Sequence, residues 1–134
     1  MAALDTNVLV RWLTGDDSKQ NAVVASLLEA TAKNNERLYV SVTVMLETEW
    51  VLRSRYRFDK PSVTSAFDSL LCATELEFQN EPALEQAFWL FKQVGGPDFA
   101  DCLHVALVSQ AGHGPLLTFD ERASKLEGAQ LLHG

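Results

Sequence analysis

Residues 4–10, LDTNVLV, join the end of a short apolar run to an acidic residue and then to a helical pattern. A buried strand that leads at once into a helix is the unit from which parallel α/β folds are built, so this stretch decides the fold class. It also places Asp5 at the strand end, where a carboxylate is costly to bury. Taken alone, Asp5 is most simply interpreted as the cap of a helix that begins at Thr6.

The same alternation of short apolar segments and helical patterns continues along the chain. The strands are predicted near residues 2–5, 37–42, 76–78, 115–119 and 129–132, and the helices near 7–13, 16–33, 43–55, 82–94 and 98–111, with one more helix opened by Pro61 and a short one from Asp120. Such alternation favours right-handed crossovers and a parallel sheet covered on both faces. We therefore predict a single domain over residues 1–134, a three-layer α/β/α sandwich with a central parallel sheet of four to five strands.

Composition bounds the class of protein. The chain has 134 residues, 47% of them hydrophobic and 22% charged, which is ordinary for a globular domain with its own core. Its net charge of −7 argues against a broad basic surface for nucleic acid, but it does not exclude an enzyme whose acids surround a metal ion. Cys72 and Cys102 lie in apolar surroundings outside any CxxC pair, so we expect two reduced, largely buried thiols. Because the sequence shows no leader and no membrane-length apolar run, we expect a cytoplasmic protein without membrane contact.

Five acids are predicted to gather at one edge of the sheet. Ligands of parallel α/β folds bind beyond the carboxyl ends of the strands, where Asp5 and Asp120 each follow a strand directly. Glu47 lies near the start of the helix that follows the second strand. Asp98 and Asp101 open a helix that leads back to the beginning of a later strand, so this helix also starts at the same edge. Four separate segments thus bring carboxylates to one rim.

These carboxylates allow two interpretations. Each could be a helix cap or a first-turn acid, but capping does not explain Glu47, which lies inside an apolar helix. Two like charges about 4 Å apart repel by about 4 kcal/mol at an effective dielectric of about 20, so a cluster of carboxylates needs cations. Oxygen ligands without organised His or Cys favour Mg²⁺, with Mn²⁺ as an alternative, as one or two ions. Such a site suits hydrolysis of a phosphodiester by a metal-activated water.

Three neighbouring residues are less clearly assigned. Glu47 and Glu49 point to nearly opposite sides of a helix, so at most one faces the rim, and spacing alone does not choose between them. His104 lies three positions after Asp101 and could face the same way, although we expect a packed side chain. His113, between two glycines, is predicted to be a solvated loop residue.

Four stretches in this order and at these distances resemble the PIN domain, and more narrowly the VapC toxins of type II toxin–antitoxin systems. They are LDTNVLV (4–10), SVTVMLETEWVL (41–52), GPDFADCLHVALV (96–108) and LLTFDER (116–122). The resemblance extends to about Ala123 and covers almost the whole chain. It implies a Mg²⁺-dependent ribonuclease that cuts RNA, a cognate antitoxin that occupies the active groove, and a homodimer.

The resemblance also implies roles for individual residues, and it selects Glu47 over Glu49. The catalytic and metal-binding acids that it implies are Asp5, Glu47, Asp101 and Asp120. The supporting residues that it implies are Asn7 and Thr118, which would hold the acids and bound waters by hydrogen bonds, and Asp98 as an additional acid.

RNA also requires positive charge, and the segment RSRYRFDK (53–60) carries it next to two aromatic residues. The predicted RNA-binding residues are Arg53, Arg55, Arg57 and Lys60, with Tyr56 and Phe58 available for stacking. The alternative is a solvated helix end whose cations complement the helix dipole.

Four large apolar side chains also have two interpretations: they could form the core, or they could line a groove for a dimer partner or the antitoxin. They are Trp12, Leu13, Trp50 and Phe67. We expect most of them in the core, because large aromatic side chains dominate packing.

Two other classes of function remain open at this stage. An α/β phosphatase or phosphoacceptor domain would also use Asp5, but the phosphatase motif DxDxT is not matched by the DTN that follows Leu4. A non-catalytic module could instead receive a basic peptide at the acidic rim. Loss of metal-dependent RNA cleavage on replacement of Asp5 would separate the nuclease from both.

Overall fold

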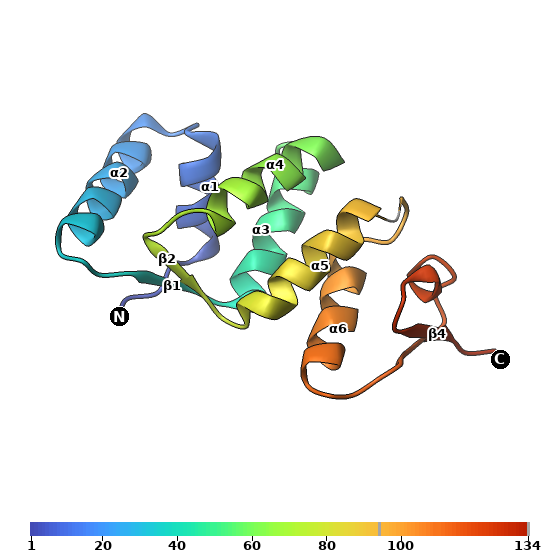
Figure 1. Cartoon of the computed structure of the whole chain (residues 1–134). Helices are drawn as coiled ribbons and strands as arrows, with labels where there is room; N and C mark the ends of the chain where they lie inside the picture. The colour runs from blue at the N-terminus through green and yellow to red at the C-terminus, as the bar shows by residue number, and fades with distance from the viewer. Residues whose placement is uncertain (94, 134) are drawn as a thin grey trace. The chain divides into compact units, whose positions relative to one another are not determined.

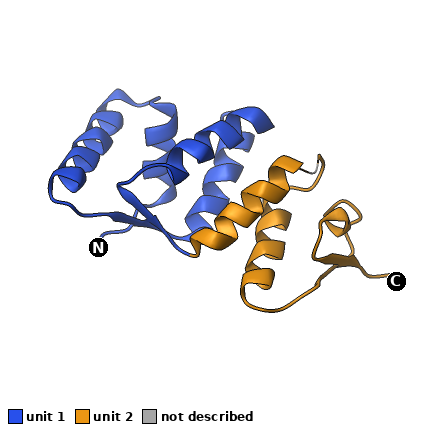
Figure 2. Ribbon diagram, viewed as in Figure 1, with its two compact units in different colours: residues 1–79 blue, residues 80–134 orange. Residues whose placement is uncertain are grey.

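The computed structural model describes residues 1–93 and 95–133. The chain divides into two compact units, Met1–Gln79 and Asn80–Gly134, which Figure 2 colours separately. Helices and short strands alternate along both units, as Figure 1 shows. Each unit is described in turn.

The first unit contains four helices and two strands. These are α1 (Thr6–Thr14), α2 (Ser18–Lys33), β1 (Leu38–Val40), α3 (Val42–Ser54), α4 (Lys60–Leu71) and β2 (Leu76–Phe78). Local signals set their ends: Gly15 closes α1 with a φ of 62°, and the Asp17 side chain accepts a hydrogen bond from the Gln20 N–H at the start of α2. The strands β1 and β2 pair in parallel, with Leu38 opposite Leu76.

The core of the first unit lies where α1 packs against α2 and α3 and where α3 meets α4. Apolar side chains from each of these layers are fully buried, among them Leu9, Met45, Leu52 and Phe67. Burying a side chain of this size contributes about 1.5–3 kcal/mol relative to leaving it exposed. This packing holds α1 and α3 together, and those two helices carry the first acids of the candidate site.

The second unit is built on a helix pair. Its elements are α5 (Glu81–Gln93), α6 (Phe99–Gln110), β3 (Leu116–Thr118), the short 3₁₀ helix η1 (Ala123–Lys125) and β4 (Ala129–Leu131). Helix α5 packs along α6, and the ring centroids of Phe88 and Phe99 are 4.9 Å apart. The strands β3 and β4 pair in parallel, with Leu117 opposite Gln130.

The α/β class with parallel strand pairing is confirmed, and most predicted elements form close to their predicted bounds. The predicted strand at residues 2–5 is reduced to one bridge between Ala3 and Tyr39. The predicted end of a helix at Val94 falls outside the described residues. In the described part of the chain the strands form two pairs, one in each unit. One sheet of four to five strands would have to pair strands of both units, so it stays a prediction.

Some burial predictions were wrong. Cys72 is exposed, because it lies at the cap of α4 beyond its buried stripe, whereas Cys102 is buried as predicted, and among the described residues neither forms a disulfide. Phe67 is in the core, but Trp50 is 49% exposed and Trp12 is only partly covered, like its neighbour Leu13. Among the described residues, none of the helices has the length and apolar character that crossing a membrane would require.

Candidate functional site

In the first unit, Thr6 connects two of the predicted acids. Asp5 is the N-cap of α1, and its Oδ1 accepts a hydrogen bond of 2.7 Å from the Thr6 N–H. The Thr6 side chain is buried, and its hydroxyl donates to Oε1 of Glu47 on α3. Asp5 and Glu47 are both exposed, so their remaining oxygens face solvent. The sequence did not predict this role of Thr6; the signal for it is the position of Thr6 directly after Asp5.

Glu47 and Glu49 have different environments in the structure. Glu49 is only 2% exposed, and its carboxylate accepts hydrogen bonds from Arg53 one turn later, with Nε at 2.9 Å and Nη2 at 3.4 Å. A buried carboxylate needs such a partner, since an unpaired charge in the interior is strongly destabilising. Glu49 is therefore paired inside the unit, and Glu47 is the accessible carboxylate of α3. This supports the choice of Glu47.

In the second unit, three predicted acids influence one another. Asp98 precedes α6 without a side-chain capping bond, and Asp101 lies in the first turn. Burial raises the pKa of the Asp101 carboxyl above its usual value, and the negative charge of Asp120 raises it further. A hydrogen bond from the Asp98 backbone lowers this pKa, while the Asp98 charge raises it and His104 lowers it. The Asp101 carboxylate is therefore short of positive charge.

Asp120 is held at the end of β3 by its local chain. Its Oδ1 accepts hydrogen bonds from the N–H groups of Arg122 at 2.8 Å and Ala123 at 3.2 Å. Its own N–H donates to Oγ1 of Thr118 at 3.0 Å. Asp120 therefore fixes the turn that leads into η1, whose N-cap is Arg122, and its second oxygen is left for other contacts. Thr118 supports the Asp120 backbone.

Three other predicted residues lie at the surface. Asn7 is exposed and lines a hollow of about 310 Å³ between α1 and α2, together with Val8 and Val24. His104 is exposed, so the prediction of a packed side chain was wrong: the buried stripe of α6 passes on either side of it. His113 is exposed, as predicted for a loop residue.

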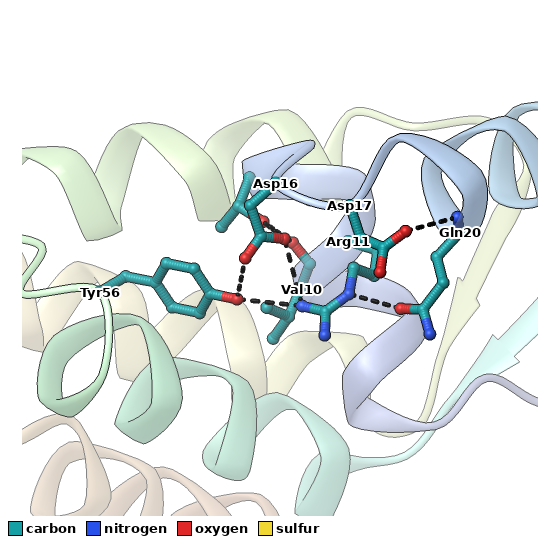
Figure 3. Close-up of polar contacts among 7 residues, drawn as sticks. Val10, Arg11, Asp16, Asp17, Gln20 and Tyr56 are labelled. Carbon is teal, nitrogen blue, oxygen red and sulfur yellow. Dashed lines mark hydrogen bonds and ion pairs between the residues drawn. The ribbon is translucent and has the colours of Figure 1, made fainter.

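The basic segment 53–60 is only partly available for RNA. The Arg53 guanidinium is bonded to Glu49, while Arg55 and Arg57 are exposed. The hydroxyl of Tyr56 donates to Asp16 and accepts from Arg11, as Figure 3 shows. Contact between this segment and RNA stays a prediction.

The candidate metal ligands of the site suit a hard divalent cation. All of them are carboxylate oxygens, and the pKa of Asp101 is raised first by burial and then by the charge of Asp120, which a cation would offset. Within neither unit do three His, Cys, Asp or Glu side chains of the described residues group closely enough to hold a metal ion. Each unit by itself therefore supplies only part of the ligand set that the sequence predicts.

Comparison with known proteins identifies the class. The sequence model of the PIN domain family matches residues 2–129, nearly the whole chain, so this chain belongs to the PIN domain family. The predicted PIN-like α/β fold is thereby confirmed.

Particular relatives carry the VapC name. The chain is 25% identical over 126 residues to a VapC ribonuclease of Aquifex aeolicus (strain VF5). The matched region is 94% of this chain and 92% of the relative. It also resembles the crystal structure of VapC20 from Mycobacterium tuberculosis, described as a toxin that cleaves the sarcin-ricin loop. The two share 16% identity with a TM-score of 0.43, and the match covers 96% of this chain and 98% of VapC20. A chain of the VapBC2 structure from Rickettsia felis, bound to a DNA fragment from its promoter, matches with 17% identity and a TM-score of 0.39. The match covers 98% of this chain and 96% of that one.

Proposed function

We propose that this protein is a Mg²⁺-dependent endoribonuclease and the toxin component of a type II toxin–antitoxin system. The observation that carries the proposal is the PIN family match over residues 2–129, because this range contains all four acidic motifs. The relative named a VapC ribonuclease supports it over almost the same length.

The proposed ligands of Mg²⁺ or Mn²⁺, bound as one or two ions, are four carboxylates: Asp5, Glu47, Asp101 and Asp120. A bound divalent cation would neutralise phosphate charge and lower the pKa of an attacking water. Asn7, Thr118 and Asp98 are proposed as supporting residues. This assignment rests on the sequence motifs and on family membership.

The chain's own groups explain how such ligands are prepared. The Thr6 N–H and hydroxyl orient Asp5 and Glu47 before any cation arrives. Thr118 and two backbone N–H groups fix Asp120. Preorganised oxygen ligands lower the cost of ordering the site when the substrate binds.

Substrate and partners follow from the same proposal. The exposed Arg55 and Arg57, with Arg53 and Lys60, would contact RNA phosphates. We propose a cognate antitoxin as partner, a homodimer as the assembly, the cytoplasm as the location and a single domain over residues 1–134.

Replacement of Asp5 by Asn tests this function. Asn is as good an N-cap as Asp, so the fold should survive, while one anionic ligand is lost. Cleavage of end-labelled ribosomal and transfer RNA in Mg²⁺ should fall by at least about a thousandfold, the scale of losing an essential group. Asp17→Asn is the matched control, because Asp17 is the N-cap of α2, where it accepts a hydrogen bond from the Gln20 N–H at 3.0 Å.

Two results would contradict the proposal. One is equal RNA cleavage by the Asp5→Asn and Asp17→Asn variants. The other is cleavage that persists in excess chelator. Hydrolysis of phosphomonoesters without action on RNA would instead favour a phosphatase that uses Asp5.

A further inference from the structure

A closed set of hydrogen bonds lies at the C-terminal part of α1, as Figure 3 shows. Nη1 of Arg11 donates to Oδ1 of Asp16 at 3.2 Å and to the hydroxyl of Tyr56 at 2.9 Å. The Tyr56 hydroxyl donates in turn to Oδ2 of Asp16 at 2.6 Å. Nε of Arg11 is held by Oε1 of Gln20 at 2.6 Å. We call Arg11, Asp16 and Tyr56 the polar brace.

The polar brace joins the two helices that carry the acids of the first unit. Arg11 belongs to α1, Asp16 follows that helix, and Tyr56 comes two residues after the end of α3. The same helices are also joined through the hydroxyl of Thr6 and the carboxylate of Glu47.

The polar brace and the Thr6–Glu47 hydrogen bond together restrain the arrangement of α1 and α3 more than either contact does alone. Thr6 and Arg11 are separated by about 7.5 Å along the axis of α1, from a rise of about 1.5 Å per residue. One contact fixes a distance between two helices but permits one helix to rotate about it. A second contact at another level of α1 also fixes that rotation.

The energetics favour orientation over stability as the role of the brace. The side chains of Arg11 and Asp16 are 24% and 42% exposed, and ion pairs with such exposure add little stability. Buried apolar side chains such as Leu9 and Met45 supply the cohesion between the helices, but that attraction is non-directional. Hydrogen bonds are directional, so the brace determines how α1 is rotated against α3.

We propose that Tyr56 is a positioning residue for the metal site, acting through Arg11 and Asp16. It holds α1 in one orientation against α3, so that Asp5 and Glu47 keep the separation that a divalent ion requires. The inference rests on the proposed function. Mg²⁺ demands near-ideal coordination geometry, so a small rotation of α1 weakens metal binding before it affects the fold. Tyr56 would then have a different role from the base stacking predicted from its sequence context.

The test uses Tyr56→Phe, with Tyr39→Phe as the matched control, since Tyr39 lies on β1 of the same unit and loses the same hydroxyl group. The Mg²⁺ concentration for half-maximal RNA cleavage should rise by roughly threefold to tenfold in Tyr56→Phe. This is below the roughly 10–100-fold loss seen when a direct partner of a metal ligand is removed. The maximal rate at saturating Mg²⁺ should stay close to that of the unmodified protein, and Tyr39→Phe should leave both values unchanged.

Asp16→Asn provides a second variant if Tyr56→Phe fails to fold, because it keeps the shape and one acceptor of the brace. It should shift the Mg²⁺ requirement in the same direction by a smaller factor. An unchanged Mg²⁺ requirement in the folded variants would overturn the inference. A lower melting temperature with no change in Mg²⁺ dependence would overturn it too, because that is the result of a purely structural role.

Hydrogen exchange in the metal-free protein separates this inference from the proposed function. If the unmodified protein neither binds Mn²⁺ nor cuts RNA, the proposed function fails. The brace is then judged by backbone exchange alone: Tyr56→Phe should speed exchange in α1 relative to α4, and Tyr39→Phe should not. Equal exchange in α1 of both variants would overturn the brace itself.

Discussion

Hydrogen-bond donors hold acids in both units, and in the second unit burial also acts on Asp101. In the first unit, Thr6 donates hydrogen bonds to Asp5 and Glu47, the two acids proposed for the site. Arg53 donates to Glu49, which is not proposed for the site. In the second unit the pKa of Asp101 is raised by burial and by the charges of neighbouring acids.

Hydrogen-bond donors orient Asp5 and Glu47 in the first unit and Asp120 in the second. At Asp101, burial is the largest cause of the raised pKa and the charge of Asp120 adds to it, so a cation close to this carboxylate would be favourable.

The largest expected effect on stability comes from removing a donor in the first unit. Arg53→Ala should lower the free energy of unfolding by about 2 kcal/mol, because it leaves the buried Glu49 carboxylate without this ion pair. Arg55→Ala, a matched change at an exposed position, should stay within about 0.5 kcal/mol. Denaturant unfolding measures both.

A double-mutant cycle with Glu49→Gln makes this prediction specific. If the pair is the cause, the double variant should be less destabilised than the sum of the single changes. Equal stability of Arg53→Ala and Arg55→Ala would remove the basis for assigning Arg53 to Glu49.

A smaller effect is expected from Thr6→Val, which keeps the shape of the buried side chain but removes its hydroxyl. The loss of one hydrogen bond should cost about 1 kcal/mol in unfolding free energy. RNA cleavage should fall roughly tenfold as Glu47 loses its orientation, the low end of the loss for a direct partner of a metal ligand. Thr6→Ser retains the hydroxyl and should restore most of the cleavage. Rates that are equal in the Val and Ser variants would show that the hydroxyl does not orient Glu47.

The sequence predicted the helices well because their local signals are strong. Gly15 after α1 and Asp17 before α2 act through a few neighbouring residues. The strands are only three residues long, and pairing depends on distant segments, so the run at residues 2–5 was overestimated as a strand. Spacing along the chain cannot supply such long-range information.

The candidate site could be predicted only in part. The motifs selected the acids, whose role stays a prediction, and the structure adds that Glu49 is buried against Arg53. Thr6 was missed because a threonine at the first position of a helix normally serves the backbone alone. The exposure of His104 could not be read from its apolar neighbours, because one turn of α6 contains both a buried and an open face.

The smallest expected effect is a gain in stability in the second unit. Asp101→Asn should raise the melting temperature of the metal-free protein slightly at neutral pH, while keeping an acceptor for the Asp98 backbone. Because the pKa of Asp101 in the folded state lies above the usual 3.8, the folded state keeps its proton to higher pH than the unfolded state. The free energy of unfolding therefore falls as pH rises from the pKa of Asp101 in the unfolded state to its higher pKa in the folded state. The loss is complete above the folded-state pKa.

Thermal unfolding in EDTA from about pH 3.5 to pH 7 measures this effect. The melting temperatures of the two proteins should converge at the acidic end and separate as pH rises. Added Mg²⁺ should stabilise the unmodified protein and leave Asp101→Asn nearly unchanged. A variant that is less stable than the unmodified protein at neutral pH in EDTA would contradict the electrostatic account of the second unit.

The most direct test of the central claim is calorimetric titration of Mn²⁺ into the unmodified protein, Asp5→Asn, Asp101→Asn and the control Asp17→Asn. The claim is that Asp5 and Asp101 are both ligands of the proposed divalent cation. Affinity should therefore fall strongly in Asp5→Asn and in Asp101→Asn, and it should be unchanged in Asp17→Asn. Full Mn²⁺ affinity in either of the first two variants would contradict the claim.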